Sequence, residues 1–400
     1  METLTTPRES NPVPLTARIV LLLGANLSIT AGSSLSPVIP NMTDDFAGTP
    51  GAAFWVPLVF TLPALFVILG GPVAGFLADK LGRKPILLLS IFVGGLGGSL
   101  GAVFGSLGGI LFTRALVGLS IAGAMTATNS LIADYFNGVQ RTKFMGRQAA
   151  IGGLTSIVFL PLGGLISEVN WRLAFLSYLP LLVLLPMALF AIREPVIVTE
   201  NQNIEKKYKL QWDPEKLYIF SASFFSQFSF VTVPVYIAFF LAAVLGTGGQ
   251  AVGWLGAASS LFSFFGGILY GHFSRRNQFK KIAIGNYFLF FSGFLILGLA
   301  KSWVLVIAGE LILGFCMGLN NANLANWLSN VVDIRVRGRA NGIYATLMSL
   351  GPFTAPFFFA LVISNWDYSA AFVTSALIFG LMGLAGLFIR IREPNPSEGT

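Results

Sequence analysis

Long apolar runs follow one another along almost the whole chain, and short polar or glycine-containing turns separate them. A helix of about 20 apolar residues spans the roughly 30 Å hydrocarbon core of a bilayer. Backbone polar groups in that core need internal partners, which favours helices over isolated strands. The pattern therefore predicts an all-α membrane protein with twelve transmembrane helices, at residues 17–40, 53–78, 86–106, 108–134, 146–167, 172–192, 216–245, 251–272, 282–300, 303–331, 340–363 and 369–390.

The two halves of the chain repeat the same pattern. Ile-Arg-Glu-Pro follows the sixth expected helix at 192–195 and the twelfth at 391–394. Arg114 in the fourth helix corresponds to Glu310 in the tenth, again half a chain apart. Matches in the same order predict two pseudo-symmetric six-helix bundles. The expected divisions are a leader at 1–16, a bundle at 17–192, a polar linker at 193–215, a bundle at 216–392 and a tail at 393–400.

Charge sets the expected orientation. The 400 residues are 54% hydrophobic and 10% charged, with a formal net charge of +8. With the N-terminus inside, 22 of the 25 Lys and Arg residues fall on the cytoplasmic side, which is the bias that orients membrane helices. The sequence predicts a multi-pass protein of the cell (inner or plasma) membrane with both termini cytoplasmic. Contact with the lipid bilayer accounts for the basic charge, and no nucleic-acid partner is expected.

The turn at 75–85 places one acid and three bases between two apolar runs. It reads G-x-L-x-D-K-x-G-R-K, in which Gly75, Asp79, Gly82, Arg83 and Lys84 stand out. A charged turn this dense is costly in hydrocarbon and must lie at the membrane surface. It resembles the signature loop between helices 2 and 3 of the major facilitator superfamily of membrane transporters. The resemblance implies the major facilitator fold, with a substrate site between the two bundles.

The resemblance also implies a cytoplasmic latch. Asp79 is expected near the start of helix 11, where unpaired backbone amides favour an anion. Arg83 is expected to bridge Asp79 to Asp134 at the end of helix 4. The second-half counterpart carries Arg275 where the acid would stand, so the latch is asymmetric.

Further stretches resemble the drug:proton antiporter branch of the superfamily. Arg114 and Gly118 begin a small-residue pattern in helix 4 that is similar to a motif of proton-linked members. Helix 5 carries Pro161-Leu162-Gly163-Gly164, similar to the glycine-rich motif of the exporters. Leu160 replaces the glycine before that proline, and one spacer is missing, so the antiporter motif is incomplete.

Glu310 and Arg114 are the expected gate and proton-coupling residues. Both lie well inside spans, where a charge costs at least a few kcal/mol unless it is hydrated or paired. Helices 1, 4, 7 and 10 line the central cavity in the family's fold, so both side chains are expected to face it. Glu310 would exchange a proton, or a cationic substrate, as Arg114 approaches and withdraws; alternatively the two form a plain ion pair that closes the outer side.

Polar residues on the lining helices are the candidates for the substrate cavity. They recur along single helix faces inside otherwise apolar spans. Hydrogen bonding between helices is the alternative explanation, above all for the asparagines of helix 10. The candidates are Asn26, Thr30, Ser33, Asn129, Gln227, Tyr236, Asn320 and Asn323, with Asn321 and Asn326 beside the last two.

These features predict a secondary active transporter. The specific hypothesis is a monomeric, proton-coupled exporter (antiporter) of small organic molecules by alternating access, with no cofactor besides the coupling proton. A nutrient or metabolite symporter or facilitator of the same fold is the alternative. A membrane-embedded enzyme is not expected, because the sequence offers one His, one Cys and no phosphate-binding G-x-x-x-x-G-K. The half-chain repeat disfavours a receptor or channel.

Overall fold

The computed structural model describes residues 13–24, 26, 32–136, 138–194, 210–273, 278–333 and 336–389. Within these ranges the chain is helical, and eleven helical segments are long and apolar enough to cross a membrane. The elements are α1 (Leu15–Gly24), η1 (Ser36–Val38), α3 (Ile39–Asp45), α4 (Ala52–Leu81), α5 (Arg83–Leu100), α6 (Leu107–Tyr135), α7 (Gly138–Ser167), η2 (Trp171–Tyr178), α8 (Leu179–Ala191), α9 (Pro214–Phe230), α10 (Thr232–Leu245), α11 (Gly249–Phe273), α12 (Phe279–Gly298), α13 (Trp303–Val331), α14 (Arg337–Asn365) and α15 (Tyr368–Phe388).

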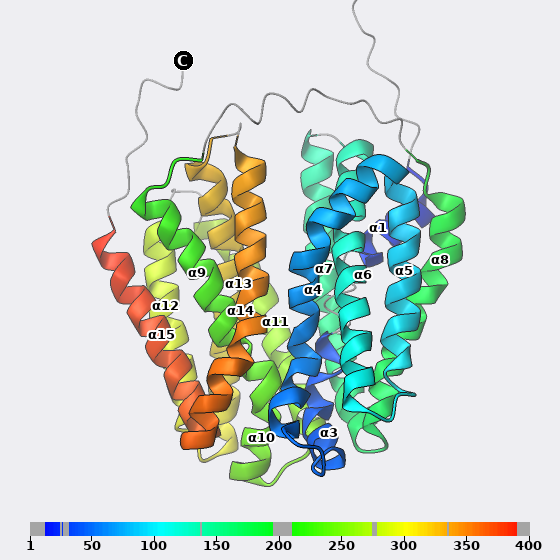
Figure 1. Cartoon of the computed structure of the whole chain (residues 1–400). Helices are drawn as coiled ribbons and strands as arrows, with labels where there is room; N and C mark the ends of the chain where they lie inside the picture. Colours follow the sequence, from blue (N-terminus) through cyan, green and yellow to red (C-terminus); the bar gives the residue numbers. More distant parts are fainter. Residues whose placement is uncertain are drawn as a thin grey trace, which may run out of the picture.

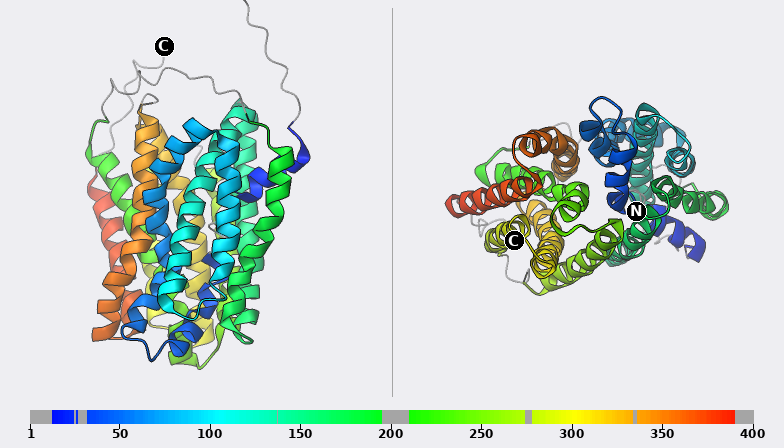
Figure 2. Two further views of the ribbon diagram at one scale, coloured as in Figure 1. Left: turned by 45° about the vertical axis from the view of Figure 1, so that its right-hand side comes forward. Right: turned by 90° about the horizontal axis from the view of Figure 1, so that it is seen from below.

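The helices form two bundles that stand side by side, α1–α8 on one side and α9–α15 on the other (Figure 1; Figure 2, right). Each bundle has its own buried core. The core cluster of the second bundle runs from Tyr218 to Met382, and the two clusters of the first lie between Ala17 and Ile192. The expected all-α membrane architecture is confirmed.

Local signals explain where several helices begin. The side chains of Ser106, Asp213 and Asp367 accept hydrogen bonds from backbone amides in the first turns of α6, α9 and α15. These amides have no partner within the helix, and such caps satisfy them. At the C-termini of α4 and α10, the capping residues Gly82 and Gly246 have φ of 97° and 64°, values that glycine tolerates best.

Two expected helices are not continuous. The first, expected at 17–40, appears as α1 and then as η1 and α3, with residues 25 and 27–31 outside the described chain. Pro37 and Pro40 stand in the first positions of η1 and α3, where proline fits because it has no N–H to lose. The seventh, expected at 216–245, is divided at Val231 into α9 and α10. Most of the expected linker, the leader and the tail lie outside the described residues.

Candidate functional site

The two bundles meet closely at the end opposite the first residues of α1 and the last residues of α15 (Figure 1). Gly253 of α11 faces the backbone of α7, where an added Cβ would lie only 2.6 Å from the Leu160 carbonyl oxygen. The Ser36 hydroxyl of η1 donates a 2.5 Å hydrogen bond to the Pro234 carbonyl of α10. The rings of Phe54 in α4 and Phe357 in α14 lie 5.3 Å apart. These contacts join the halves and close this end.

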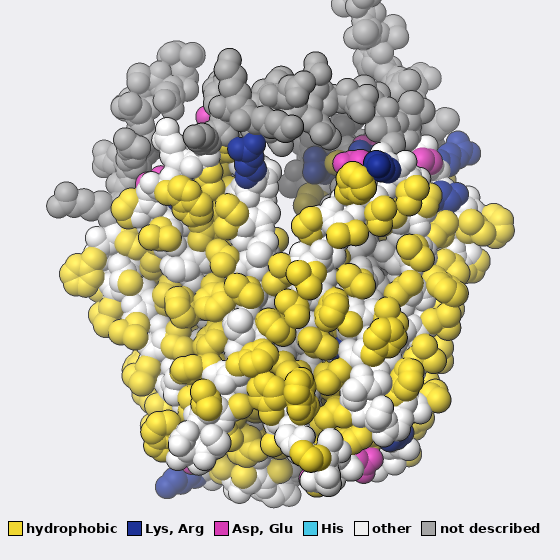
Figure 3. All heavy atoms as spheres, viewed as in Figure 1, with side chains coloured by type: hydrophobic (Ala, Val, Ile, Leu, Met, Phe, Trp, Pro, Cys, Tyr) yellow, Lys and Arg dark blue, Asp and Glu magenta, His cyan; other side chains and the backbone are white. Residues whose placement is uncertain are grey.

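The halves separate toward the other end. At Gly146 and Gly153 of α7, an added Cβ would meet nothing within 4 Å. The space-filling view shows the surface hollowed between the bundles at its upper end, where Lys and Arg side chains also gather (Figure 3). The structure is therefore open toward its basic end and closed at the other.

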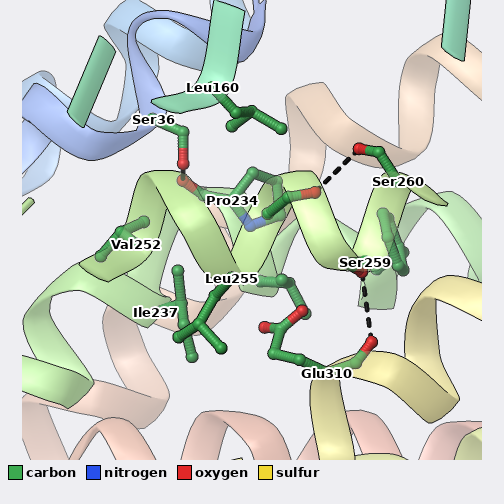
Figure 4. Close-up of a pocket in the computed structure, with 12 residues that line it drawn as sticks. Ser36, Leu160, Pro234, Ile237, Val252, Leu255, Ser259, Ser260 and Glu310 are labelled. Carbon is green, nitrogen blue, oxygen red and sulfur yellow. Dashed lines mark hydrogen bonds between the residues drawn. The ribbon is translucent and has the colours of Figure 1, made fainter. Parts of the chain in front are cut away.

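Glu310 lies in a cavity next to the closed end. The cavity has a volume of about 120 Å³ and joins the two halves through Ser36 of η1, Leu160 of α7, and residues of α9, α10, α11 and α13. It exceeds the roughly 10–15 Å³ that one water molecule requires. In Figure 4 the Glu310 carboxylate points from α13 toward Leu255 and Ile237, so the acid faces a largely apolar wall.

Within the described residues, the Glu310 carboxylate lacks a hydrogen-bond partner. The residue is 1% exposed, and neither carboxylate oxygen has a hydrogen-bond partner among the described residues. The Ser259 hydroxyl donates instead to the backbone carbonyl of Glu310, at 3.2 Å. A buried carboxylate charge without a partner is expensive. A proton or a cation in the cavity would offset that cost.

Arg114 does not contact Glu310 in this structure, so the expected approach of the two residues stays a prediction. Its guanidinium is fully buried inside the first bundle, where it donates to the Tyr178 hydroxyl (2.9 Å) and the Gly98 carbonyl (3.1 Å). It also lies 4.8 Å from the centroid of the Phe175 ring and 5.0 Å from that of Tyr178. Neutral dipoles and aromatic faces, which suit a weakly hydrated guanidinium, stand where a carboxylate was expected.

The cavity candidates divide into residues that are exposed or half-buried and residues that are buried. Asn129 is exposed on α6 and Gln227 is half-buried on α9. Tyr236 is buried within the second bundle, and the centroid of its ring lies 6.4 Å from that of Tyr368 of α15. Asn323 is also buried, and its amide donates to the Phe279 carbonyl of α12, at 3.0 Å, which agrees with the alternative of hydrogen bonding between helices.

On α13, Asn320 is also buried, whereas Asn321 and Asn326 are exposed. The Asn26 amide donates to the Leu22 carbonyl at 2.6 Å and to the Gln148 carbonyl of α7 at 3.3 Å. Ser33 is buried, and Thr30 lies outside the described residues. Hydrogen bonding between helices thus explains part of the candidate set.

The charged turn at 75–85 forms part of the expected latch. Arg83 forms an ion pair with Asp134 and donates to the Ser130 carbonyl, at 3.4 Å. Asp79 is exposed and belongs to neither of the ion pairs found within the described chain. The bridge from Arg83 to Asp79 is therefore absent in this structure, in which the basic end is open. Gly75 is half-buried on the last turns of α4.

Glu194 supplies a contact that the motif alone does not predict. Its carboxylate accepts from the backbone amides of Arg83 (2.6 Å) and Lys84 (2.8 Å), at the start of α5. Lys84 in turn donates to the Leu189 carbonyl of α8, at 2.7 Å. An added Cβ on Gly82 would lie 2.9 Å from the Glu194 carboxyl, so the glycine of the motif makes room for this cap.

Ser36, Ser259 and Glu194 are not among the residues that the sequence pattern singles out. A serine in an apolar span is a weak signal, since it often bonds to its own helix, as the Ser260 hydroxyl does to the Gly256 carbonyl at 2.8 Å. Glu194 stands in the repeated Ile-Arg-Glu-Pro, and that recurrence was available as a signal.

Comparison with known proteins agrees with this architecture. The family profile described as Major Facilitator Superfamily matches residues 21–218 and again residues 219–400. The chain belongs to this superfamily. Its two matches correspond to the two bundles, and the family that the turn at 75–85 resembles is confirmed. The enzyme alternative is thereby set aside.

Relatives within the superfamily include resistance proteins. The chain is 25% identical over 391 residues to the "Tetracycline resistance protein, class H" of Pasteurella multocida, covering 92% of this chain and 95% of that protein. It is 22% identical over 396 residues to "Multidrug resistance protein 3" of Bacillus subtilis (strain 168), covering 83% and 76%.

Solved structures share the fold. A bacterial homolog of the human lysosomal transporter Spinster, in an inward-facing and occupied conformation, aligns with a TM-score of 0.73 and 17% identity, over 94% of this chain and 97% of that one. The nucleoside transporter NupG aligns with a TM-score of 0.75 and 13% identity, over 92% and 99%.

Proposed function

We propose that this superfamily transporter is a proton-coupled exporter (antiporter) of small organic molecules that works by alternating access. The observation that carries the proposal is Glu310, a fully buried carboxylate that no described residue hydrogen-bonds, in a cavity that joins the two bundles. Full-length relatives named for tetracycline and multidrug resistance support export of organic compounds. Both bundles are supplied by one chain, which supports a monomer.

The proposed cycle uses the contacts around Glu310. The cavity is closed here by the Ser36–Pro234 and α7–α11 contacts. Opening of this end would expose Glu310 to the outside, where it takes up a proton. Closing it again and opening the basic end would release the proton inward. The distribution of Lys and Arg supports a cytoplasmic basic end, with both termini there, in the inner or plasma membrane.

The test uses purified protein in liposomes with an acidic interior. A proton antiporter should accumulate tetracycline or the organic cation ethidium in such vesicles as protons leave, and a protonophore should abolish the accumulation. Protein-free vesicles under the same gradient correct for passive partition. A symporter of the same fold would accumulate its substrate only with an alkaline interior, so the direction separates the two hypotheses.

Glu310→Gln should still bind the substrate, which a thermal-shift assay would show. Its gradient-driven accumulation of substrate should fall at least about a hundredfold, because an amide cannot carry the proton. Glu168→Gln is the matched control, since Glu168 is exposed near the same closed end, and it should accumulate substrate as the wild type does. A Glu310→Gln protein that accumulates substrate at the wild-type rate would show that Glu310 is not the proton carrier.

A further inference from the structure

A second cavity lies away from Glu310, at the basic end of the first bundle. It is formed by α1, the end of α6 and the first turns of α7, and its volume is about 240 Å³. The lining residues are Arg18, Phe136, Gln140, Lys143, Phe144 and Arg147. The volume is many times the roughly 10–15 Å³ that one water requires, so a group of several atoms fits.

The polar lining of this cavity is cationic. Arg18, Lys143 and Arg147 contribute three positive charges, and the described residues that line the cavity include no acid. Neither ion pair found in the described part of the chain involves these three residues. Asp134, the acid nearest to Lys143 along the described chain, is already engaged by Arg83. Three like charges around one small volume repel one another unless an anion joins them.

Arg18 adds an unused donor. Its Nε is buried and has no hydrogen-bond partner among the described residues. A buried donor without an acceptor destabilises the fold, and more so when the group is charged. An acceptor-rich anion in the cavity would satisfy this donor and the charge together.

The geometry points to a phosphate group. Guanidinium groups bind phosphate oxygens through paired N–H donors, and this cavity offers two guanidinium groups, an ammonium and the Gln140 amide. The rings of Phe136 and Phe144 stack with their centroids 4.5 Å apart, and they form an apolar wall beside the charges. Basic pockets between helices at the membrane surface suit phospholipid headgroups.

We propose that the pocket between α1 and α7 is a binding site for a phosphate-bearing anion, which holds the first helix against the fifth span. The ligand is either the headgroup of an anionic phospholipid or a soluble phosphate compound. The site does not depend on the proposed transport of protons, and a failure of either proposal leaves the other standing.

Thermal unfolding of the full-length, delipidated protein in neutral detergent tests the site. One arm adds sodium phosphate against sodium chloride at equal ionic strength. The other adds dioctanoyl phosphatidylglycerol against dioctanoyl phosphatidylcholine. A ligand that binds only the folded protein raises the melting temperature saturably, here by about 2–4 °C. A shift with inorganic phosphate indicates a soluble ligand, and a shift with phosphatidylglycerol alone indicates a lipid headgroup.

Arg18→Gln and Arg147→Gln should each raise the half-saturating concentration about tenfold, since each removes charged hydrogen bonds. If the arginine variants do not fold, Lys143→Gln replaces them in the same measurement. Arg141→Gln is the matched control, because Arg141 is exposed on the same helix but does not line the cavity, and it should keep the wild-type response. Absence of a shift in both arms, or an equal loss in Arg141→Gln, would overturn the proposal.

Discussion

At the scale of single residues, Arg114 illustrates how a bundle holds a buried cation without an acid. Three neutral oxygens and two aromatic rings surround its guanidinium, and all of them come from the first bundle. Its charge is therefore solvated by groups that move with it. In this structure Arg114 stabilises the first bundle and does not contact the other half.

A double-mutant cycle tests this role through stability. Arg114→Gln and Tyr178→Phe should show a coupling energy of about 1.5–3 kcal/mol, the value of a hydrogen bond to a charged group. Arg114→Gln and Glu310→Gln share no partner and should be additive to within about 0.5 kcal/mol. Thermal unfolding of the purified variants in detergent measures both. A larger coupling with Glu310 than with Tyr178 would restore the ion-pair hypothesis.

At the scale of helices, the close approach of α7 and α11 holds the closed end together. Gly253 is central, because an added Cβ would meet only backbone, the Leu160 carbonyl oxygen at 2.6 Å and the Pro161 Cα at 3.0 Å. Small residues permit this kind of approach between membrane helices. The glycines of these helices therefore act as an interface between the halves.

Gly253→Ala should push α7 and α11 apart, at a cost of about 1–3 kcal/mol to the closed end. The variant is expected to populate states that are open at that end. When the F54C/F357C pair is introduced into it, a bifunctional thiol reagent should cross-link the two cysteines in lower yield. Gly153→Ala is the matched control on α7, since nothing lies within 4 Å of its added Cβ. Equal yields in the two variants would argue that the Gly253 contact does not hold the end closed.

At the scale of the whole molecule, one end is closed while the charged turn at the other is only partly engaged. The Arg83–Asp134 contact and the Glu194 cap both lie inside the first bundle. They can persist while the bundles rotate relative to each other. Asp79, by contrast, is exposed and available to the start of α14 when the basic end closes.

Asp79→Asn is therefore expected to destabilise only the state that is closed at the basic end. The cross-linking yield across F54C/F357C should rise, and the equilibrium should shift roughly two- to fivefold, the usual effect of one charge at a helix N-terminus. Asp44→Asn, which removes an exposed acid near the opposite end, should leave the yield unchanged. An unchanged yield in Asp79→Asn would contradict the latch.

The sequence by itself determined the membrane spans, the family and the basic end. Runs of about 20 apolar residues have no favourable place outside a bilayer, and the charged turn at 75–85 has none inside it. For the same reason, α6, α13 and α14 begin and end within a few residues of the expected bounds.

Only the tertiary structure decided which way each helix face points. A span that is apolar on every side gives no period from which to orient Arg114, Tyr236 or Asn323. Their directions follow from packing against α5, α15 and α12, which are far away in the sequence. The surroundings of Glu310 likewise depend on η1 and on four other helices, α7, α9, α10 and α11, that form its cavity, and no local pattern contains that information.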